Sequence, residues 1–145
     1  MSWTELNAYQ NTSSKDYNNQ TGKTTGYNNE GNITYTKTDS DGNGVNEETI
    51  FYSKETNSKE ITQNDNETGR IMSKSRYVDD KCQYNQTFEY YENGNTKNMN
   101  IDNDGDGKVD YIIEYLYDED GNMSAKQKDV RPLGAKIKDV FKSLF

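Results

Sequence analysis

Oxygen-bearing side chains recur at alternate positions in one short acidic stretch of this chain, and glycines separate them. In residues 102–110, aspartates stand at the first, third, fifth and ninth places and glycines at the fourth and sixth. Carboxylates this close repel one another unless a cation lies among them, and calcium takes roughly six to eight oxygen ligands at about 2.3–2.6 Å. The stretch therefore predicts a calcium loop. Its expected ligands are the carboxylates of Asp102, Asp104, Asp106 and Asp110 and the backbone carbonyl of Lys108.

A second acidic stretch, residues 39–47, repeats this spacing 63 residues earlier in the chain. Asparagine stands at its fifth place and glutamate at its ninth, so it offers three carboxylates instead of four. The alignment continues without a gap on both sides, where Tyr27 matches Tyr90 and Ile50 matches Ile113. We interpret this pattern as an internal duplication that includes the loop.

The residues on both sides of each acidic stretch favour β-strands. Ile33–Thr38 is β-branched and aromatic, and Glu48–Tyr52 resumes that composition, which predicts a hairpin whose connection is the first loop. After the second loop, apolar side chains alternate from Val109 to Tyr117, and we expect this strand to be the most buried one. Flanking strands, and an isoleucine at the twelfth place where a bidentate glutamate is expected, separate both loops from the helix-flanked calcium hand.

Turn signals punctuate the rest of the chain. Asn93-Gly94 is a strong hairpin signal, and Asn66 with Gly69 predicts another tight turn. Asp118–Asn122 lacks a second glycine, so we interpret it as a turn and not as a third ion site. The sequence therefore predicts an all-β fold, an antiparallel β-meander of repeated hairpins in a single sheet or sandwich, followed by a short C-terminal amphipathic helix.

Composition divides the chain into three parts. Residues 1–26 form a polar N-terminal segment, in which Trp3 and Leu6 could anchor a short helix and Asn11–Thr25 is interpreted as turn or tail. Residues 27–128 form the β-repeat calcium-binding domain, with duplicated units at about 27–52 and 90–115. Residues 129–145 form the amphipathic helix, which either caps the sheet or docks a partner. Its apolar positions are Leu133, Ile137, Val140, Phe141 and Leu144.

The chain has few residues with which to build an apolar core. Leucine, isoleucine, valine and phenylalanine together make up about 14% of its 145 residues, a proportion at which a chain with a net charge of −8 is expected to be disordered. Twelve tyrosines supply large rings that suit a half-exposed sheet. Bound cations are the second expected source of stability, since an ion that binds only the folded state adds about 2.7 kcal/mol per site at 100 times its dissociation constant.

Several classes of function do not fit this composition. The negative net charge disfavours nucleic acid and anionic membranes as partners. The sequence has no histidine and one cysteine, Cys82, which removes the usual zinc and thiol–imidazole sites. It shows neither a nucleophile with a base nor a phosphate loop before a helix, so we expect no enzyme. No apolar run reaches the length of a membrane span, and residues 1–20 lack the pattern of a secretory leader.

The nine-residue pattern D-x-D-x-[DN]-G-x-x-[DE] between strands resembles the calcium loops of integrin-type (FG-GAP) β-propeller blades, and thrombospondin type 3 repeats use a related spacing. The resemblance implies that places one, three, five, seven and nine coordinate the ion. The first loop departs from the pattern's usual aspartates with asparagine at place five and glutamate at place nine. Its implied ligands are Asp39, Asp41, Asn43, Val45 and Glu47, and those of the second loop are Asp102, Asp104, Asp106, Lys108 and Asp110.

Tyr-x-x-x-Gly-Asn phrases, as in Tyr90–Asn95, resemble the hairpins of YD-repeat and MORN-variant arrays over Tyr27–Asn122. Chains of this composition look like bacterial surface or secreted repeat proteins that are loaded with calcium. By that analogy we expect an extracellular or cell-surface protein.

Two functional hypotheses follow. The first is a calcium-binding β-repeat module with a structural, adhesive or assembly role, which could meet a protein partner or another copy through its sheet edges or C-terminal helix. Its affinities are expected near 10⁻⁴–10⁻³ M, with the second loop tighter because it has one more carboxylate. The second is an intracellular acidic interaction protein, an inhibitor or a secretion accessory factor, in which both loops are ordinary Asp-Gly turns.

Overall fold

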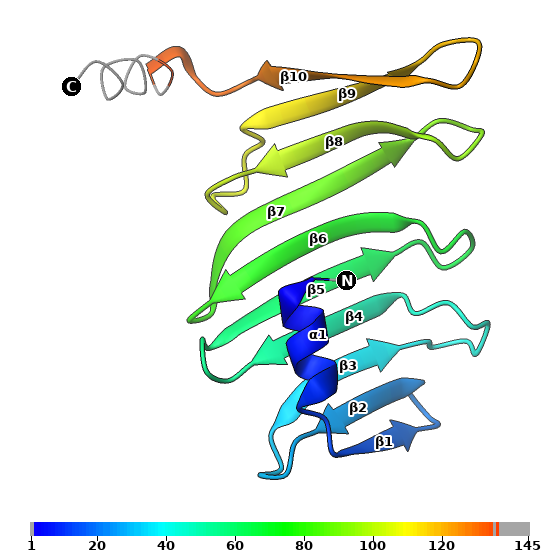
Figure 1. Ribbon diagram of the computed structural model, residues 1–145, viewed down its shortest axis with the longest axis vertical. Coiled ribbons are helices and arrows are strands. Elements are labelled where there is room, and N and C mark those ends of the chain that lie inside the picture. The colour runs from blue at the N-terminus through cyan, green and yellow to red at the C-terminus, as the bar shows by residue number, and fades with distance from the viewer. Residues whose placement is uncertain (1, 135, 137–145) are drawn as a thin grey trace.

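The computed structural model describes residues 2–134 and residue 136 as one antiparallel sheet of ten strands in sequence order, with a helix on one face (Figure 1). Each strand pairs with the next, so the predicted all-β meander is confirmed and takes the form of a single sheet instead of a sandwich. The elements are α1 (Trp3–Gln10), β1 (Ser14–Asn18), β2 (Lys23–Tyr27), β3 (Ile33–Thr38), β4 (Glu48–Ser53), β5 (Ser58–Asn64), β6 (Ile71–Val78), β7 (Lys81–Tyr90), β8 (Thr96–Asp102), β9 (Tyr111–Tyr117) and β10 (Met123–Asp129).

Helix α1 packs against β3 and β4, and these three elements form the small core. The hydroxyl of Ser2 caps the helix by accepting a hydrogen bond from the Glu5 amide at 3.1 Å. Among the described residues, the buried hydrophobic ones are Ala8, Tyr35 and Phe51, and Tyr9 packs against them. The Tyr9 ring lies 5.4 Å from the ring of Tyr35 and 5.4 Å from that of Phe51.

The residues expected to anchor this helix do not do so. Trp3 is 79% exposed and Leu6 is 38% exposed. The buried positions are Thr4 and Ala8, which are four residues apart and therefore lie on one face of the helix. The prediction of Trp3 and Leu6 as anchors is wrong, because small side chains let the helix approach the Tyr35 and Phe51 rings.

The prediction of turn or tail for Asn11–Thr25 is also wrong, because β1 and most of β2 lie there. The lysine, aspartate, asparagine and glycine residues of these strands have low β propensity, but β2 completes a ladder with β3, in which Gly26 pairs with Tyr35. A Cβ on Gly26 would lie 2.4 Å from a ring carbon of Tyr35, so glycine allows this close approach. Ladder pairing outweighs local composition in this segment.

The internal duplication is repeated residue by residue in the sheet. Lys23 pairs with Thr38 as Gln86 pairs with Ile101, and both ladders shift register at the same place, after Gly26 and after Glu89. The β3–β4 and β8–β9 ladders correspond in the same way. The duplicated structural unit is therefore β2–β4, which matches β7–β9.

The three Tyr-x-x-x-Gly-Asn phrases form the same turn. In each, the residue after the tyrosine donates its amide to the asparagine carbonyl and accepts the glycine amide at its own carbonyl. The donors at 2.8–3.0 Å are the amides of Asn28, Tyr91 and Asp118. Asp118–Asn122 is thus a turn, as predicted.

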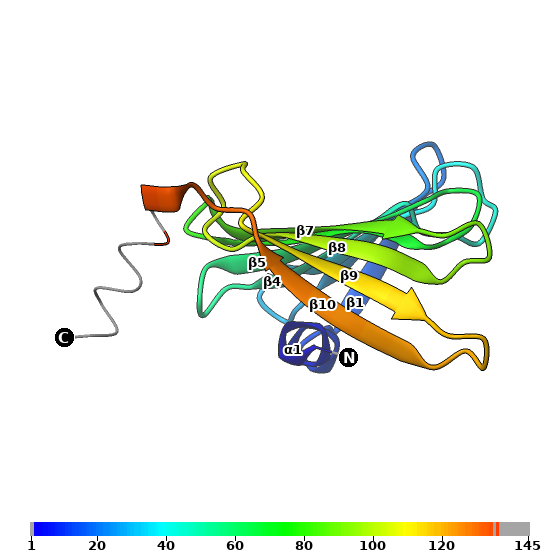
Figure 2. The same ribbon diagram turned by 90° about the horizontal axis from the view of Figure 1, so that it is seen from above.

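The sheet is a single twisted layer, and α1 covers only part of one face (Figure 2). For this reason β9 is not the most buried strand: none of its residues is buried, and Leu116 is 56% exposed. The most buried strand is β3, whose Thr34, Tyr35 and Thr36 are all buried. The expectation for β9 fails because none of the described residues forms a second layer over its apolar side chains.

Among the described residues the helix of the fold is N-terminal, not C-terminal. The predicted helix over 129–145 begins too early, since Asp129 is the last residue of β10. Residues 135 and 137–145 of that prediction lie outside the described residues.

Candidate metal centre

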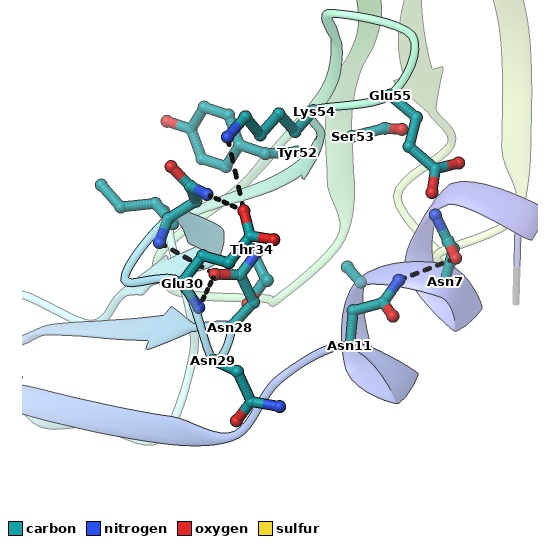
Figure 3. A pocket seen from close by; sticks show the side chains of 13 residues that line it. Asn7, Asn11, Asn28, Asn29, Glu30, Thr34, Tyr52, Ser53, Lys54 and Glu55 are labelled. Atoms are coloured by element: carbon teal, nitrogen blue, oxygen red, sulfur yellow. Dashed lines mark hydrogen bonds and ion pairs between the residues drawn. The ribbon is translucent and has the colours of Figure 1, made fainter.

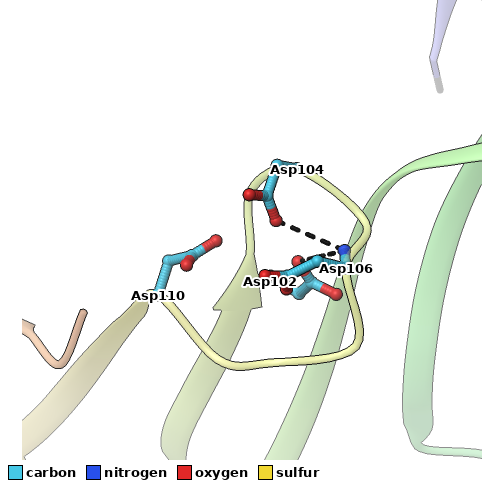
Figure 4. Close-up of side chains that lie close together, drawn as sticks. All are labelled: Asp102, Asp104, Asp106 and Asp110. Carbon is cyan, nitrogen blue, oxygen red and sulfur yellow. Dashed lines mark hydrogen bonds between the residues drawn. The ribbon is translucent and has the colours of Figure 1, made fainter. Parts of the chain in front are cut away.

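The second acidic stretch connects β8 to β9 and gathers four carboxylates (Figure 4). One oxygen from each of Asp102, Asp104, Asp106 and Asp110 lies within 4.8 Å of the others. Asp102 and Asp110 stand at the two ends of the loop and are 6% and 9% exposed, whereas Asp104 and Asp106 are exposed. Two carboxylates of this acidic group are therefore shielded from solvent, and the other two are open to it.

Backbone amides fold the loop around its first carboxylate. Asp102 accepts hydrogen bonds at Oδ1 from the Gly105 and Asp106 amides, at 2.9 and 3.2 Å, and at Oδ2 from the Gly107 amide at 2.8 Å. The φ angles of Gly105 and Gly107 are 74° and 88°, a region that favours glycine. Both glycines therefore have the turn-forming role that the sequence predicts.

The loop also packs against the start of the neighbouring strand β7. A Cβ added to Gly105 would lie 2.1 Å from the carbonyl oxygen of Cys82. The fourth place of this loop therefore needs glycine for space as well as for its φ angle.

Two carboxylates of this loop differ in their proton affinity. Burial acts to raise the pKa of Asp102, but hydrogen bonds, led by the Gly107 amide, lower its pKa below the ordinary value. The Asp106 amide acts to lower the pKa of Asp104, yet partial desolvation, the Asp102 carboxyl and the charges of Asp106 and Asp110 together raise it. The neighbouring carboxylates thus disfavour the negative charge of Asp104.

The first acidic stretch connects β3 to β4 with the same internal hydrogen bonds. Asp39 accepts from the Gly42 and Asn43 amides at 3.0 and 3.2 Å and from the Gly44 amide at 2.8 Å. Oxygens of Asp39, Asp41 and Glu47 lie within 4.8 Å of one another. The two acidic groups therefore share one local structure as well as one sequence pattern.

The ninth-place residues of both loops are held by the amide of the second-place residue. Both carboxylate oxygens of Glu47 accept from the Ser40 amide at 3.1 Å, and the Ser40 hydroxyl, followed by backbone hydrogen bonds, lowers the pKa of Glu47. Asp110 accepts from the Asn103 amide at 2.8 Å. Glutamate at this place thus reaches the position that aspartate occupies in the second loop.

The predicted seventh-place residues occupy corresponding positions. The Val45 amide donates to Asn43 Oδ1 at 2.9 Å, and the Lys108 amide donates to Asp106 Oδ1 at 2.8 Å. The role of their carbonyl oxygens as ligands stays a prediction.

One neighbour of the first loop was missed by the sequence reasoning. Asn66, in the β5–β6 turn, donates from Nδ2 to Asp41 Oδ2 at 2.8 Å, and its carbonyl accepts from Asn43 Nδ2 at 2.8 Å. The Asn66 side chain is the main reason why the pKa of Asp41 is lowered. In a meander, every second connection lies at the same end of the sheet. The order of the strands could therefore have placed the β5–β6 turn beside the β3–β4 loop.

The second loop has a different neighbour, the segment that follows β10. The Val130 amide donates to the Asp110 carbonyl at 2.9 Å. Arg131 pairs with Asp129 at 2.7 Å, and its guanidinium carbon lies 5.1 Å from the centre of the Tyr111 ring. The Arg131 side chain accordingly lowers the pKa of Asp129 to about 2.

A separate hollow of about 520 Å³ lies between α1, the β2–β3 turn and the β4–β5 turn (Figure 3). Amide side chains line much of it, and Asn11 donates to Asn7 at 2.9 Å. Lys54 and Glu30 form an exposed ion pair at 3.6 Å across its rim. The hollow does not gather carboxylates as the two loops do.

A scan of the chain against models of known protein families finds no match, and a search of curated protein sequences finds none either. The two loops themselves indicate which class of ion they suit. Their donors are carboxylate and amide oxygens, the ligands of hard cations such as calcium and magnesium. Each acidic group could hold a metal ion.

Proposed function

We propose that this chain is a calcium-binding β-repeat module whose two ions stabilise the β3–β4 and β8–β9 connections. The observation that carries the proposal is the repeated loop structure: in both loops, backbone amides hold a first-place aspartate while further carboxylates converge within 4.8 Å. Like charges gathered in this way destabilise the fold unless a cation neutralises them.

The weak core supports the same role. Among the described residues, only Ala8, Tyr35 and Phe51 are buried hydrophobic residues, so the sheet has little apolar stabilisation. Two ions bound at 100 times their dissociation constants would each add about 2.7 kcal/mol, which is a large part of the stability of a small domain.

The proposed affinity class suits a structural, adhesive or assembly role outside the cell or on its surface. Neither loop has the bidentate glutamate of intracellular sensor sites, so we place both near 10⁻⁴–10⁻³ M, where calcium outside cells fills them. The four-carboxylate loop binds more tightly than the three-carboxylate loop.

We further propose that the module is not an enzyme. Within the described residues, no helix has the length and hydropathy that crossing a bilayer requires.

Calorimetric titration with calcium, paired with thermal unfolding in calcium and in chelator, tests this function. Asp102→Asn should abolish one binding event and lower the calcium-dependent rise in melting temperature. Asp118→Asn is the matched control, because Asp118, like Asp102, accepts hydrogen bonds from backbone amides of the turn that follows it, but it belongs to neither acidic group. Absence of binding heat, or equal effects of the two substitutions, would refute the proposal.

The second candidate is an acidic interaction protein whose loops are plain turns, and one observation favours it. Backbone amides already close both loops through hydrogen bonds to Asp39 and Asp102. The double substitution Asp104→Lys and Asp106→Lys separates the two ideas. It should abolish calcium stabilisation in the first case, whereas in the second the protein would fold equally well and lose only its basic partner.

A further inference from the structure

Both edge strands of the sheet, β1 and β10, have one side with which no described residue pairs. All five residues of β1 are exposed, and six of the seven residues of β10 are exposed. An open edge presents unpaired backbone amides and carbonyls, which can pair with a strand of another chain. The two edges are therefore candidate contact surfaces.

The two edges fit each other in direction. The meander has ten strands, each antiparallel to the next, so β1 and β10 run in opposite directions (Figure 1). A second copy placed beside the first in the same orientation would therefore present its β1 antiparallel to β10. The contact would continue the alternation of the meander, with only the ordinary twist between neighbouring strands.

The backbone groups that point outward from β10 belong to every second residue. Neighbouring residues of an antiparallel strand turn their amides and carbonyls to opposite sides. The Val130 amide donates to the Asp110 carbonyl at 2.9 Å, toward the start of β9. The backbone groups of Asp129 and Gln127 therefore point outward.

Strand β1 has matching outward groups at Lys15 and Tyr17. The Asp39 amide donates to the Gly22 carbonyl, so residues 24 and 26 also turn their backbone groups toward β3. Residues 23, 25 and 27 then turn toward β1, where they pair with residues 18, 16 and 14. Lys15 and Tyr17 lie between those residues, so their amides and carbonyls point outward.

The outward residues of both edges lie on the same face of the sheet. Side chains of directly paired residues share a face. Tyr35, beneath α1, pairs with Gly26, which pairs with Lys15. Ladder pairs carry the same face across β4–β9 to Ile113, which pairs with Gln127. Joining the two edges through their outward residues would therefore keep α1 of successive copies on one face.

The charges along the two edges are complementary in that arrangement. Placing Lys15 opposite Asp129 also places Asp16 opposite Lys128, so one pair of opposite charge forms on each face. In the part of the chain that the structure describes, neither Lys15 nor Asp16 forms an ion pair. Both charges of β1 are therefore available to a second copy.

The two charges of β10 remain accessible, although each already has a partner. Lys128 contacts Glu114 at 2.8 Å, and its side chain is 48% exposed. Asp129 contacts Arg131 at 2.7 Å, and its side chain is 32% exposed. Each new pair would extend an existing one, and charges in a network contribute more than isolated surface pairs do.

Pairing between two identical edges is disfavoured. Two β10 strands paired about Gln127 would bring Lys126 opposite Lys128. Two β1 strands paired about Asp16 would bring the two Asp16 carboxylates opposite each other. Lysines on an edge strand often prevent contacts between like edges. The lysines of β10 thus disfavour a second β10 and favour the acidic residue of β1.

We infer that this chain assembles with itself head to tail, with β10 of one copy adding to β1 of the next. A contact between two different surfaces of one chain leaves a free surface at each end, so the sheet would extend as an open filament of meanders. The inference rests on the assembly role proposed above, but it does not depend on calcium in either loop.

Light scattering of the full chain over a range of concentrations, in excess calcium and low salt, tests the inference. The average mass should rise steadily with concentration. Asp16→Lys and Lys128→Asp should each weaken association by about tenfold, because each places like charges opposite one another. An equimolar mixture of the two variants should recover association, since the changed strand of each then meets the changed strand of the other. Glu55→Lys, the same kind of charge reversal in an exposed turn between β4 and β5, should have no effect.

Gln127→Pro tests the backbone contact without reversing a charge. It removes an amide that points outward, so it should weaken association and leave the β9–β10 ladder and the melting temperature nearly unchanged. Monomers at every concentration up to the millimolar range, a mass that stops at the dimer, or no recovery in the mixture would overturn the inference. Calcium titration of the same proteins reports separately on the proposed function. Binding heat without association would overturn the inference alone, and association without binding heat would overturn only the calcium function.

Discussion

Replacing the fourth-place glycine of each loop by alanine separates backbone strain from packing. Gly42 and Gly105 occupy equivalent places and have nearly equal φ angles, 72° and 74°. Alanine in this left-handed region costs about 1–2 kcal/mol in either loop. Around Gly42, however, a Cβ would have no neighbour within 4 Å, whereas at Gly105 it would lie 2.1 Å from the Cys82 carbonyl oxygen.

Gly42→Ala should therefore cost only the strain. Gly105→Ala should cost roughly a further 1–3 kcal/mol, because the second loop and the start of β7 must move apart. Urea unfolding in excess calcium measures both losses. Gly105→Ala should also weaken calcium binding at the second loop, since its displaced backbone carries the amides that orient Asp102. Equal losses of stability in the two variants would refute the packing of the second loop against Cys82.

Three further predictions concern other contacts. Asn66→Ala removes hydrogen bonds to Asp41 and Asn43, so calorimetry should show weaker calcium binding at the first loop and an unchanged second loop; equal weakening of both would contradict this. Phe51→Ala should destabilise the protein by about 3–5 kcal/mol in urea unfolding, whereas Trp3→Ala should change stability by less than about 0.5 kcal/mol, because Phe51 is 5% exposed and Trp3 is 79% exposed. Arg131→Gln should return the carboxyl pKa of Asp129 from about 2 toward its ordinary value in an NMR titration. Because the folded pKa is lowered, the stabilisation from this pair is present above the ordinary pKa and disappears as the pH falls toward 2, so the variant should lose stability at neutral pH and be less sensitive to acid.

Local patterns in the sequence predicted the strands on either side of the first acidic loop, and the turns of the Tyr-x-x-x-Gly-Asn phrases. Ile33–Thr38 is β3 in full, and the duplication of the acidic loops reappears in the ladders of β2–β4 and β7–β9. These features depend on neighbouring residues and on turn chemistry, which a sequence contains directly.

Features that depend on contacts between distant residues were not predicted. Lys23–Tyr27 has no strong strand signal of its own and becomes a strand by pairing with β3. The contact of Asn66 with the first loop depends on which connections share an end of the sheet. The burial of β9 was overestimated because alternation of apolar residues shows which face is apolar, but not whether another layer covers it.

The number of strands between the duplicated loops determines how the two sites relate. Five strand positions separate β3 from β8 in the meander, and an odd number reverses the strand direction, so the two loops lie at opposite ends of the sheet (Figure 1). Ile50 and its counterpart Ile113 also lie on opposite faces. Ladder pairs place Phe51, Glu60, Arg76 and Tyr84 on the face that also carries Phe88, Met99 and Ile113, and Ile50, which is next to Phe51, points to the other face. At the usual strand spacing the loops are about 24 Å apart across the sheet, in addition to their separation along the strands. Sites this far apart, with no shared neighbour, should act additively to within about 0.5 kcal/mol. The two proposed ion sites would therefore act independently and stabilise different parts of one sheet, and would not form a single cooperative switch.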